Sequence, residues 1–507
     1  MSRMNELHKM QGGRDKEMAN IRKLPMLLGV LIFVAAVALA GCGGGNSVNS
    51  SSINGNQGVS PNTANPSNGS ESAAETAGPA NEGTDKEPVT LKYTFWGSPQ
   101  EKKALEEATK KFTEKYPWIT VNAVHIPESD YDTKLTAMVA AGETPDAGYV
   151  HGELGEAWQK EGKFINFNEM FAKDTELKKE DFLDYIWFNG DDPNYTWGIS
   201  TAGETFALFY NKDLFEEAGV EMPPAKAEDA WTWDQFVEAA KQLTIDKNGK
   251  NAADPGFDKD NIKQFGVSFE SWYGPVMAHI VNNEGDLVSE DGTKFALDQP
   301  EAVEAIQRLA DLINVHHVAP NPVQAKSIPS QAVALQSKLV AMSMHGQWIN
   351  LDLGAAEVNY DIGVLPKMKR SVAMGISGVS AMFKSTKHPE ETWLLTKFLA
   401  DPSGALNLYR DGLWMPTLKK WYTDPELVAQ WAENNPSHPS GFKDAFLTNL
   451  LNNSTPSPVY YVKNFGKVSS LAFSALDPVW LGKQSAEEAM KEVASKVQPE
   501  IQGRYGK

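Results

Sequence analysis

Cys42 is the only cysteine in this chain of 507 residues, and it directly follows Leu39-Ala40-Gly41. An apolar run begins at Leu24 and leads up to these residues. The basic residues Arg14, Lys16, Arg22 and Lys23 precede the run. Basic residues, then an apolar run, then small residues is the order of a secretory signal and its cleavage site. Because the chain has no second cysteine, a disulfide within the chain does not explain Cys42.

The four residues Leu39-Ala40-Gly41-Cys42 resemble the lipobox of bacterial lipoproteins. This resemblance implies that residues 1–41 are a signal peptide and that Cys42 is diacylated and becomes the mature N-terminus. Each buried acyl CH₂ contributes roughly 0.8 kcal/mol, so two acyl chains would hold a soluble domain at a membrane face. Two alternatives stay open, a transmembrane helix at the lower length limit of about 17 residues and an incidental buried thiol. Met1 and Met18 are both candidate starts of the signal.

The other motifs that could carry catalysis or hold a metal are weak. The segment Gly375-Ile376-Ser377-Gly378 is not a nucleophile elbow, because its last glycine is displaced, and the sequence has no His-Glu-x-x-His. Asp246-Lys247-Asn248-Gly249 lacks the closing glutamate of a calcium loop, and we interpret it as a turn. We interpret His316-His317 as an exposed cap at a helix end. We therefore expect no enzyme activity, no metal site and no cofactor.

Residues 42–88 have the composition of a flexible tether. They are mostly Gly, Ser, Asn, Pro, Thr and Ala, with no aromatic residue and only three large aliphatic ones: Val48, Ile53 and Val59. Such a segment cannot bury enough apolar surface to offset its ordering entropy. We expect it to let the folded region reach away from a membrane.

Size and charge limit what the remaining region can do. Residues 89–507 are too many for one small domain and fit two domains of ordinary size. The whole chain carries a formal net charge of −19. Nucleic-acid binding needs a basic face, so we expect no nucleic-acid partner.

The folded region begins with the pattern of a strand followed by a helix. Residues 91–96 alternate like a strand, and Gly97 breaks the pattern. Ser98 as N-cap, Pro99 at the first position and Glu101 at the third predict a helix start with a capping box. The buried face of this helix is marked by Ala104, Leu105, Ala108 and Phe112.

The same pattern then repeats. Residues 119–125 and 146–150 read as strands, and residues 131–141 between them read as a helix. The order β-α-β-α-β predicts a parallel sheet covered by helices. Ligands of such sheets lie beyond the carboxyl ends of the strands, where Trp96-Gly97-Ser98 and His151-Gly152-Glu153 fall.

From residue 89 to residue 501 the chain resembles the extracellular solute-binding proteins of ABC importers, a cluster that includes the maltose-binding proteins. The resemblance is carried by the order and spacing of several stretches: 144–146 with 162–165, 204–214 with 231–236, 341–348, 362–366 with 375–378, and 388–391 with 398–399. It implies an α/β, two-lobe, periplasmic-binding-protein-like fold of type II (a Venus flytrap) with hinge strands between the lobes. Lobe 1 would comprise residues 89–205 and 379–418, and lobe 2 residues 206–378 and 419–507. The implied crossings lie at 204–208, 375–380 and 416–421.

The resemblance also implies a carbohydrate site between the lobes. A sugar ring needs a flat aromatic under its C–H face and charged or amide acceptors around its hydroxyls. Trp348 matches the tryptophan that stacks on sugar in maltose-binding relatives. Glu204 matches the acid that these relatives place on the hinge strand, and Glu153 matches an Asp that binds their ligand. Leu154 stands where those relatives have Arg, and Val150 where they have a stacking Trp, so maltose itself is not indicated.

Four further residues are candidates for the same site. Trp96 ends the first strand, and Trp272 falls, with Tyr273, in a loop where relatives supply an aromatic. Ser377 lies in a glycine-flanked segment that either offers backbone N–H groups to a ligand or serves as a hinge. Trp414 lies beside the third crossing and either touches ligand or packs the hinge.

The resemblance implies a lipid-anchored binding component of an ABC importer at the extracellular face of the membrane. It would bind a carbohydrate, expected to be an oligosaccharide, act as a monomer, and deliver its ligand to the permease subunits. A secreted glycoside hydrolase is the alternative from a different class, because Glu153 and Glu204 could form a catalytic pair about 5–10 Å apart. A ligand-presenting sensor on the same fold also stays open.

Overall fold

The computed structural model describes residues 86–433 and 435–506. All of them belong to the second of the two units into which the chain divides, residues 79–507. The expected signal peptide, Cys42 and all but the end of the expected tether lie outside the described residues. Within the described part, no helix is both long enough and apolar enough to cross a membrane.

A six-stranded sheet with strand order β2-β1-β3-β12-β5-β4 forms the centre of the first lobe. Strand β1 pairs in parallel with β2 and β3, as the β-α-β-α-β pattern predicts. The later strands β12, β5 and β4 add to this core in antiparallel pairs. The bounds are β1 (Val89–Phe95), β2 (Ile119–His125), β3 (Ala147–Val150), β4 (Trp187–Asn189), β5 (Thr196–Ser200) and β12 (Val379–Met382).

Helix α1 (Pro99–Lys115) begins as its sequence predicts. Ser98 is the N-cap and accepts a hydrogen bond from the backbone N–H of Glu101, and the predicted apolar face from Ala104 to Phe112 is buried. The predicted capping box was wrong in its second half. The Glu101 carboxylate instead accepts a hydrogen bond from the hydroxyl of Tyr149, 3.4 Å away, because β3 brings that residue beside the helix start.

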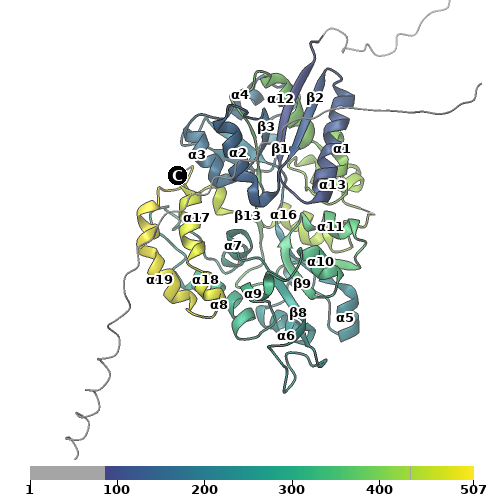
Figure 1. Ribbon diagram of the computed structural model, residues 1–507, viewed down its shortest axis with the longest axis vertical. Coiled ribbons are helices and arrows are strands. Elements are labelled where there is room, and N and C mark those ends of the chain that lie inside the picture. Colours follow the sequence, from purple (N-terminus) through teal and green to yellow (C-terminus); the bar gives the residue numbers. More distant parts are fainter. Residues whose placement is uncertain (1–85, 434, 507) are drawn as a thin grey trace, which may run out of the picture. The chain divides into compact units, whose positions relative to one another are not determined.

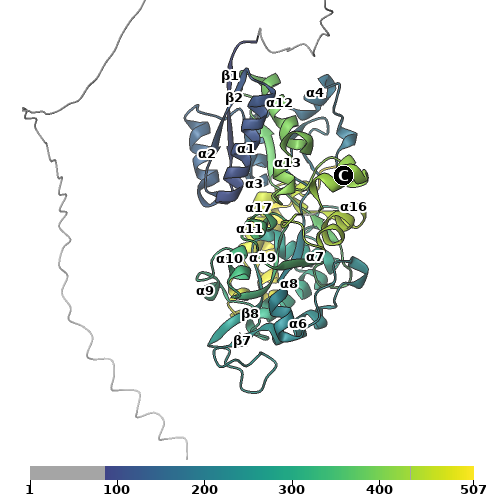
Figure 2. The same ribbon diagram turned by 90° about the vertical axis from the view of Figure 1, so that its right-hand side faces the viewer.

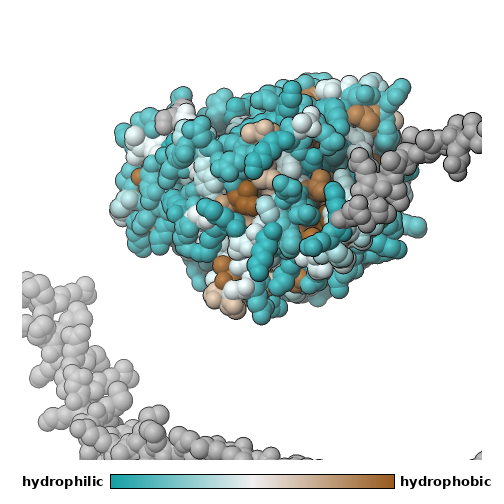
Figure 3. All heavy atoms as spheres, turned by 90° about the horizontal axis from the view of Figure 1, so that it is seen from above, coloured by the Kyte–Doolittle hydropathy of each residue, from teal (hydrophilic) through white to brown (hydrophobic). Residues whose placement is uncertain are grey.

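Helices cover both faces of the first sheet. Helix α1 packs against α12 (Pro389–Ala400) and α13 (Pro402–Arg410). Helix α2 (Tyr131–Ala140) lies on the other side of β1 from α1 in both views (Figures 1 and 2). Seen from above, the surface is mostly hydrophilic, with hydrophobic residues in small scattered groups (Figure 3).

A five-stranded sheet with strand order β10-β6-β9-β8-β7 forms the centre of the second lobe. Its inner strand β9 is buried along its whole length, between β6 and β8. Such an inner strand favours continuous apolar sequence over alternation. The bounds are β6 (Phe206–Asn211), β7 (Ile245–Asp246), β8 (Ile262–Phe269), β9 (Val340–Gly346) and β10 (Tyr360–Gly363).

Two connections between the lobes meet at one point. The chain leaves the first sheet after β5 and enters the second at β6, and it returns through β11 (Ala373–Gly375) into β12. Glu204 and Ile376, one on each connection, form an isolated antiparallel bridge, with the Ile376 N–H donating to the Glu204 carbonyl at 2.9 Å. A short pair of β11 with β13 (Ser454–Pro456) lies next to this bridge.

The remaining helices complete the two lobes. They are α3 (Gly152–Lys160), α4 (Phe167–Lys173), α5 (Lys212–Ala218), α6 (Trp233–Leu243), α7 (Tyr273–Asn282), α8 (Pro300–Asn314), α9 (Pro322–Ala325), α10 (Gln331–Gln336), α11 (Ile349–Ala355), α14 (Lys420–Thr423), α15 (Pro425–Trp431), α16 (Asn449–Asn452), α17 (Phe465–Ser474), α18 (Asp477–Trp480) and α19 (Ala486–Val497).

Two local motifs from the sequence have clear outcomes. The segment 246–249 is a turn, as predicted, in which the Asp246 carboxylate accepts from the backbone N–H groups of Asn248 and Lys250. His317 contacts the Ile313 carbonyl just beyond the end of α8, so it caps that helix. His316 and His317 are half-buried, however, and the prediction of an exposed cap was wrong in that respect.

Candidate functional site

A cleft of about 1030 Å³ is lined by residues from both lobes and from the connections between them. It lies beyond the carboxyl ends of β1 and β3, where parallel sheets place their ligands. All seven residues predicted from the sequence to bind ligand line this cleft: Trp96, Glu153, Glu204, Trp272, Trp348, Ser377 and Trp414. The structure therefore brings them together, and contact with a ligand stays a prediction for each.

Trp348 and Trp272 are the tryptophans of the second lobe that line the cleft. Both pack on Phe206, the first residue of β6, with ring centroids 5.8 Å away in each case. Trp348 is half-buried and meets the Phe206 ring at 75°, while Trp272 is 36% exposed. A single buried phenylalanine at the start of β6 thus supports both indole rings.

Two glycines let these indoles lie close to the backbone. A Cβ atom on Gly346 would stand 2.1 Å from the ring of Trp348, and one on Gly274 would stand 2.3 Å from the ring of Trp272. Any larger residue at either position would displace the ring. The Gly-x-Trp spacing at 346–348 and the Trp-x-Gly spacing at 272–274 therefore fix where the indoles lie.

Trp96 lies at the end of β1 in a different environment. Its ring stacks on the imidazole of His151 with 4.2 Å between centroids and 16° between planes. The rings of Tyr131 and Tyr149 pack against it at steep angles of 84° and 72°, with 4.9 and 4.7 Å between centroids. One face of Trp96 is therefore occupied by His151, which leaves this indole less free to serve as a platform than Trp348.

Trp414 is only 3% exposed, so it belongs mainly to the wall of the cleft. Its ring packs against Tyr149 and Tyr409, at 6.3 and 5.9 Å between centroids. The sequence leaves two roles open for Trp414, contact with ligand and packing. Packing covers most of the surface of its side chain.

Glu204 lies on the connection between β5 and β6 and is only 7% exposed. Burial raises the pKa of its carboxyl to about 8, and the hydroxyl of Ser377 offsets part of that shift. The same hydroxyl accepts a hydrogen bond from the backbone N–H of Ala202 at 3.2 Å. Ser377 thus ties one connection to the other beside the carboxylate.

Glu153 lies in the first turn of α3, next to the end of β3. Burial raises the pKa of its carboxyl, although its contacts with the backbone and His151 oppose the change. His151 contacts the Asp132 carboxylate through Nδ1 at 2.8 Å. Burial lowers the pKa of His151, but the hydrogen bond and charge of Asp132 outweigh it, so the net pKa is raised.

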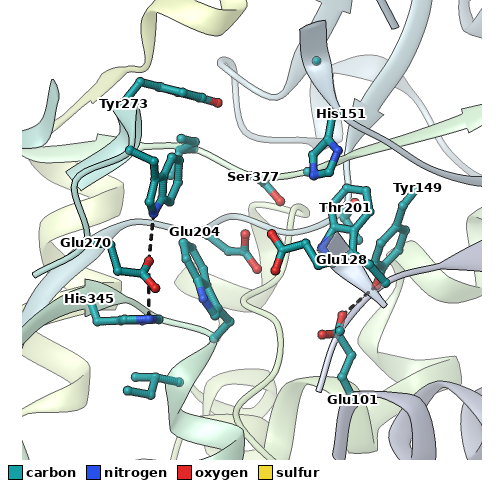
Figure 4. Close-up of a pocket in the computed structure, with 18 of the residues that line it drawn as sticks. Glu101, Glu128, Tyr149, His151, Thr201, Glu204, Glu270, Tyr273, His345 and Ser377 are labelled. Carbon is teal, nitrogen blue, oxygen red and sulfur yellow. Dashed lines mark hydrogen bonds and ion pairs between the residues drawn. The ribbon is translucent and has the colours of Figure 1, made fainter. Parts of the chain in front are cut away.

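A cluster in the second lobe escaped sequence reasoning. The Trp272 indole N–H donates to Glu270 Oε2 at 2.8 Å, and the same oxygen lies 3.9 Å from Nε2 of His345 (Figure 4). His345 also packs on Trp348, with 5.5 Å between centroids. Glu270 therefore connects the two predicted tryptophans through one histidine.

The start of α1 and the start of α11 contribute two further acids that sequence reasoning missed. The sequence predicts Glu101 only as part of a capping box and indicates no role for Asp352. Ser98 donates to Asp352 Oδ1 at 3.2 Å. Burial raises the pKa of both carboxyls, and the charges of Glu204 and Asp352 raise that of Glu101 further. The position of Asp352 near a Gly-x-Trp motif was the only sequence signal available.

Among residues 86–433 and 435–506, no three His, Cys, Asp or Glu side chains are grouped as a metal site would require. The arrangement supports binding through aromatic faces and hydrogen-bond acceptors.

Comparison with known proteins agrees with this geometry. The family model described as bacterial extracellular solute-binding protein matches residues 96–406. A protein of Brucella abortus (strain 2308), named only as a binding protein, is 24% identical over 409 residues, or 77% of this chain and 88% of that protein. The melibiose/raffinose/stachyose-binding protein MelE of Bacillus subtilis (strain 168) is 24% identical over 305 residues, or 56% of this chain and 62% of MelE.

A solved structure supports the fold. An ABC substrate-binding protein from Listeria monocytogenes, in complex with cycloalternan, superposes with a TM-score of 0.70 at 23% sequence identity, covering 82% of this chain and 99% of that chain. The two-lobe α/β fold of type II periplasmic binding proteins, with hinge strands between the lobes, is therefore confirmed. With the family model matching more than half of its length, the chain belongs to the family of bacterial extracellular solute-binding proteins.

Proposed function

We propose that this protein binds an oligosaccharide in the cleft between its lobes and delivers it to the membrane subunits of an ABC importer. One observation carries the proposal. Trp348 and Trp272, held by Phe206 on the second lobe, share a cleft with acids of the first lobe and the connection between the lobes. Indole faces suit the C–H faces of sugar rings, and carboxylates suit their hydroxyls.

The size of the cleft favours more than one sugar ring. Ligand pockets commonly measure about 300–1,000 Å³, and this cleft of about 1030 Å³ stands at the upper end. The names of relatives point the same way, because MelE binds melibiose, raffinose and stachyose and the Listeria protein was solved with cycloalternan.

We also propose that the lobes close on the ligand and that a lipid anchors the protein to the membrane. The lobes, taken as residues 89–205 with 379–418 and residues 206–378 with 419–507, close on the ligand by bending at the connections near Glu204 and Ile376. The Cys42 lipid anchor holds the protein, as a monomer, at the extracellular face of the membrane, and residues 42–88 serve as its tether. The sequence pattern at 39–42 supports the anchor.

A thermal-shift screen tests the binding function. The folded region, residues 86–507, is melted alone and with neutral, amino-bearing and acidic mono- and oligosaccharides. A ligand present at 100 times its dissociation constant adds about 2.7 kcal/mol to the free energy of unfolding and raises the melting temperature visibly. No shift with any saccharide would contradict the proposal. Release of product from a glycan would favour the hydrolase alternative, in which Glu153 and Glu204 act as the acids.

A further inference from the structure

Acidic side chains dominate the charged lining of the cleft. Among the described residues that line it there are seven carboxylates and neither a lysine nor an arginine. Its two histidines, His151 and His345, already face Asp132 and Glu270. The seven acids are Glu101, Glu128, Asp132, Glu153, Glu204, Glu270 and Asp352.

Three of these acids act on a fourth, Glu101, and all four come from separate segments. Glu101 lies on α1, Glu128 on the short helix η1 (Glu128–Asp130), and Asp352 on α11. The charges of Glu204, Glu128 and Asp352 all raise the pKa of Glu101, in addition to its burial. In Figure 4 the carboxylates of Glu128 and Glu204 point toward the same part of the cleft. The cleft thus collects carboxyl groups without a basic side chain to balance them, and burial opposes the ionisation of Glu101 and Glu204.

A neutral ligand would form only hydrogen bonds with these acids and would leave the cost of ionising Glu101 and Glu204 in place. A ligand with positive charge would relieve it, because a cleft of one sign with low-dielectric walls concentrates the opposite sign. A bound metal ion fits poorly, since the described residues contain no metal-binding group of three side chains. The positive charge is therefore best supplied by an organic cation.

The aromatic residues of the cleft suit the same kind of ligand. Trp272 and Trp348 lie in the cleft together with Glu270, which accepts the Trp272 indole N–H. An ammonium group is attracted to the face of an indole within about 6 Å of its centre. Carboxylates and indole faces side by side offer a protonated amine both kinds of contact at once.

We propose that the ligand of this cleft is a saccharide that carries a protonated amine, such as a glucosamine-type unit, and that the cleft discriminates against uronates and phosphorylated sugars. This inference rests on the proposed saccharide-binding function and specifies its ligand class. Glu204 and Glu101 are the acids that face the amine.

Titration calorimetry with matched saccharides tests the inference. The charged probes are glucosamine, galactosamine and mannosamine with free amino groups, together with their dimers and trimers. The matched controls are the N-acetylated compounds, the neutral hexoses and the uronates of the same sugars. We expect at least one amino-saccharide to bind ten times or more tightly than its N-acetylated and neutral counterparts, and uronates not to bind. Its affinity should fall as salt is added, because screening weakens charge contacts.

Variants assign the effect to the acids. Glu204→Gln and Glu101→Gln should each weaken binding of the amino-saccharide at least tenfold and that of the neutral counterpart less than threefold. Glu114→Gln, an equal change of charge at an exposed position of α1, should leave both affinities as they were. Circular dichroism of each variant confirms that it is folded.

Failure of this inference can be distinguished from failure of the proposed function. Neutral or acidic saccharides that bind as tightly as amino-saccharides would overturn this inference and leave the proposed function intact. No binding of any saccharide would overturn both.

Discussion

The hydroxyl of Ser98 donates a hydrogen bond to the Asp352 carboxylate, 3.2 Å away, although the two residues are 254 positions apart in the sequence. Ser98 caps α1 in the first lobe, and Asp352 lies in the first turn of α11 in the second lobe. One side chain therefore starts a helix and joins the two walls of the cleft.

This double role predicts different results from two substitutions. Ser98→Ala removes the cap and the contact across the cleft, and should lower the free energy of unfolding by about 0.5–2 kcal/mol. Ser98→Asp keeps a good cap but sets a second carboxylate against Asp352, so it should favour an open cleft. Small-angle scattering should then give a larger radius of gyration for Ser98→Asp than for Ser98→Ala. Equal radii for both variants would show that the contact has no influence on the lobes.

Closure on ligand is the second prediction. We expect the lobes to bend at the connections that meet at Glu204 and Ile376. A saturating ligand shifts the population toward the closed form and should reduce the radius of gyration in solution. Scattering curves that superpose with and without ligand would count against a hinge at these connections.

Glu204 predicts a specific dependence of stability on pH. Burial raises the pKa of its carboxyl to about 8, from an ordinary value of 4.5. Above pH 4.5 the carboxyl ionises in the unfolded chain but stays protonated in the folded protein. The contribution of this carboxyl to the free energy of unfolding is therefore fully present below pH 4.5. It is lost as pH rises to about 8.

Glu204→Gln removes this dependence, because an amide does not titrate. The variant should match the wild type near pH 4.5 and exceed its free energy of unfolding by a few kcal/mol at most at pH 8, since one pKa unit corresponds to about 1.4 kcal/mol. Urea unfolding of both proteins at pH 4.5, 6 and 8 measures the difference. A difference that stays constant across this range would mean that the Glu204 carboxyl titrates normally.

The order of elements was the part of the fold that the sequence predicted best. The strand β1, the Ser98 cap and the apolar face of α1 rest on local signals, and they were confirmed. The alternation itself holds only in the first part of β1, because Thr94 is buried between Tyr93 and Phe95. The hydrogen-bond partner of the Glu101 carboxylate could not be predicted from such local signals. Its partner Tyr149 is 48 positions away, so only the folded sheet brings the two together.

The same reason explains which cleft residues were missed. The tryptophans stand in recognisable motifs, so the sequence predicts them. The link from Trp272 through Glu270 to His345 joins β8, α7 and β9, and it exists only because parallel pairing of β8 and β9 aligns those ends. No local spacing marks such a set of contacts.

The anchor can be tested independently of the cleft. Cys42→Ala removes the only thiol and with it the expected site of acylation. In cells, we expect the variant in the medium or as uncleaved precursor, whereas the wild type fractionates with the membrane. Normal processing and membrane attachment of Cys42→Ala would contradict the lipoprotein interpretation.

Two variants test the aromatic and acidic parts of the cleft. Trp348→Ala should lose about 1–3 kcal/mol of apolar contact, and Glu204→Ala a similar amount because ligand hydroxyls lose their acceptor. Each variant should therefore weaken binding about tenfold or more. Trp118→Ala provides the control, since this half-buried tryptophan precedes β2 at the opposite end of the sheet from Trp96.

The most direct test of a saccharide site on Trp348 is calorimetric titration of wild type, Trp348→Ala and Trp118→Ala with the best saccharide from the screen, together with melting of each protein without ligand. If Trp348 carries a saccharide site, Trp348→Ala loses about tenfold or more in affinity while its melting temperature changes little, and Trp118→Ala keeps its affinity. Unchanged affinity of Trp348→Ala with a large drop in its melting temperature would make Trp348 a core residue and contradict the account.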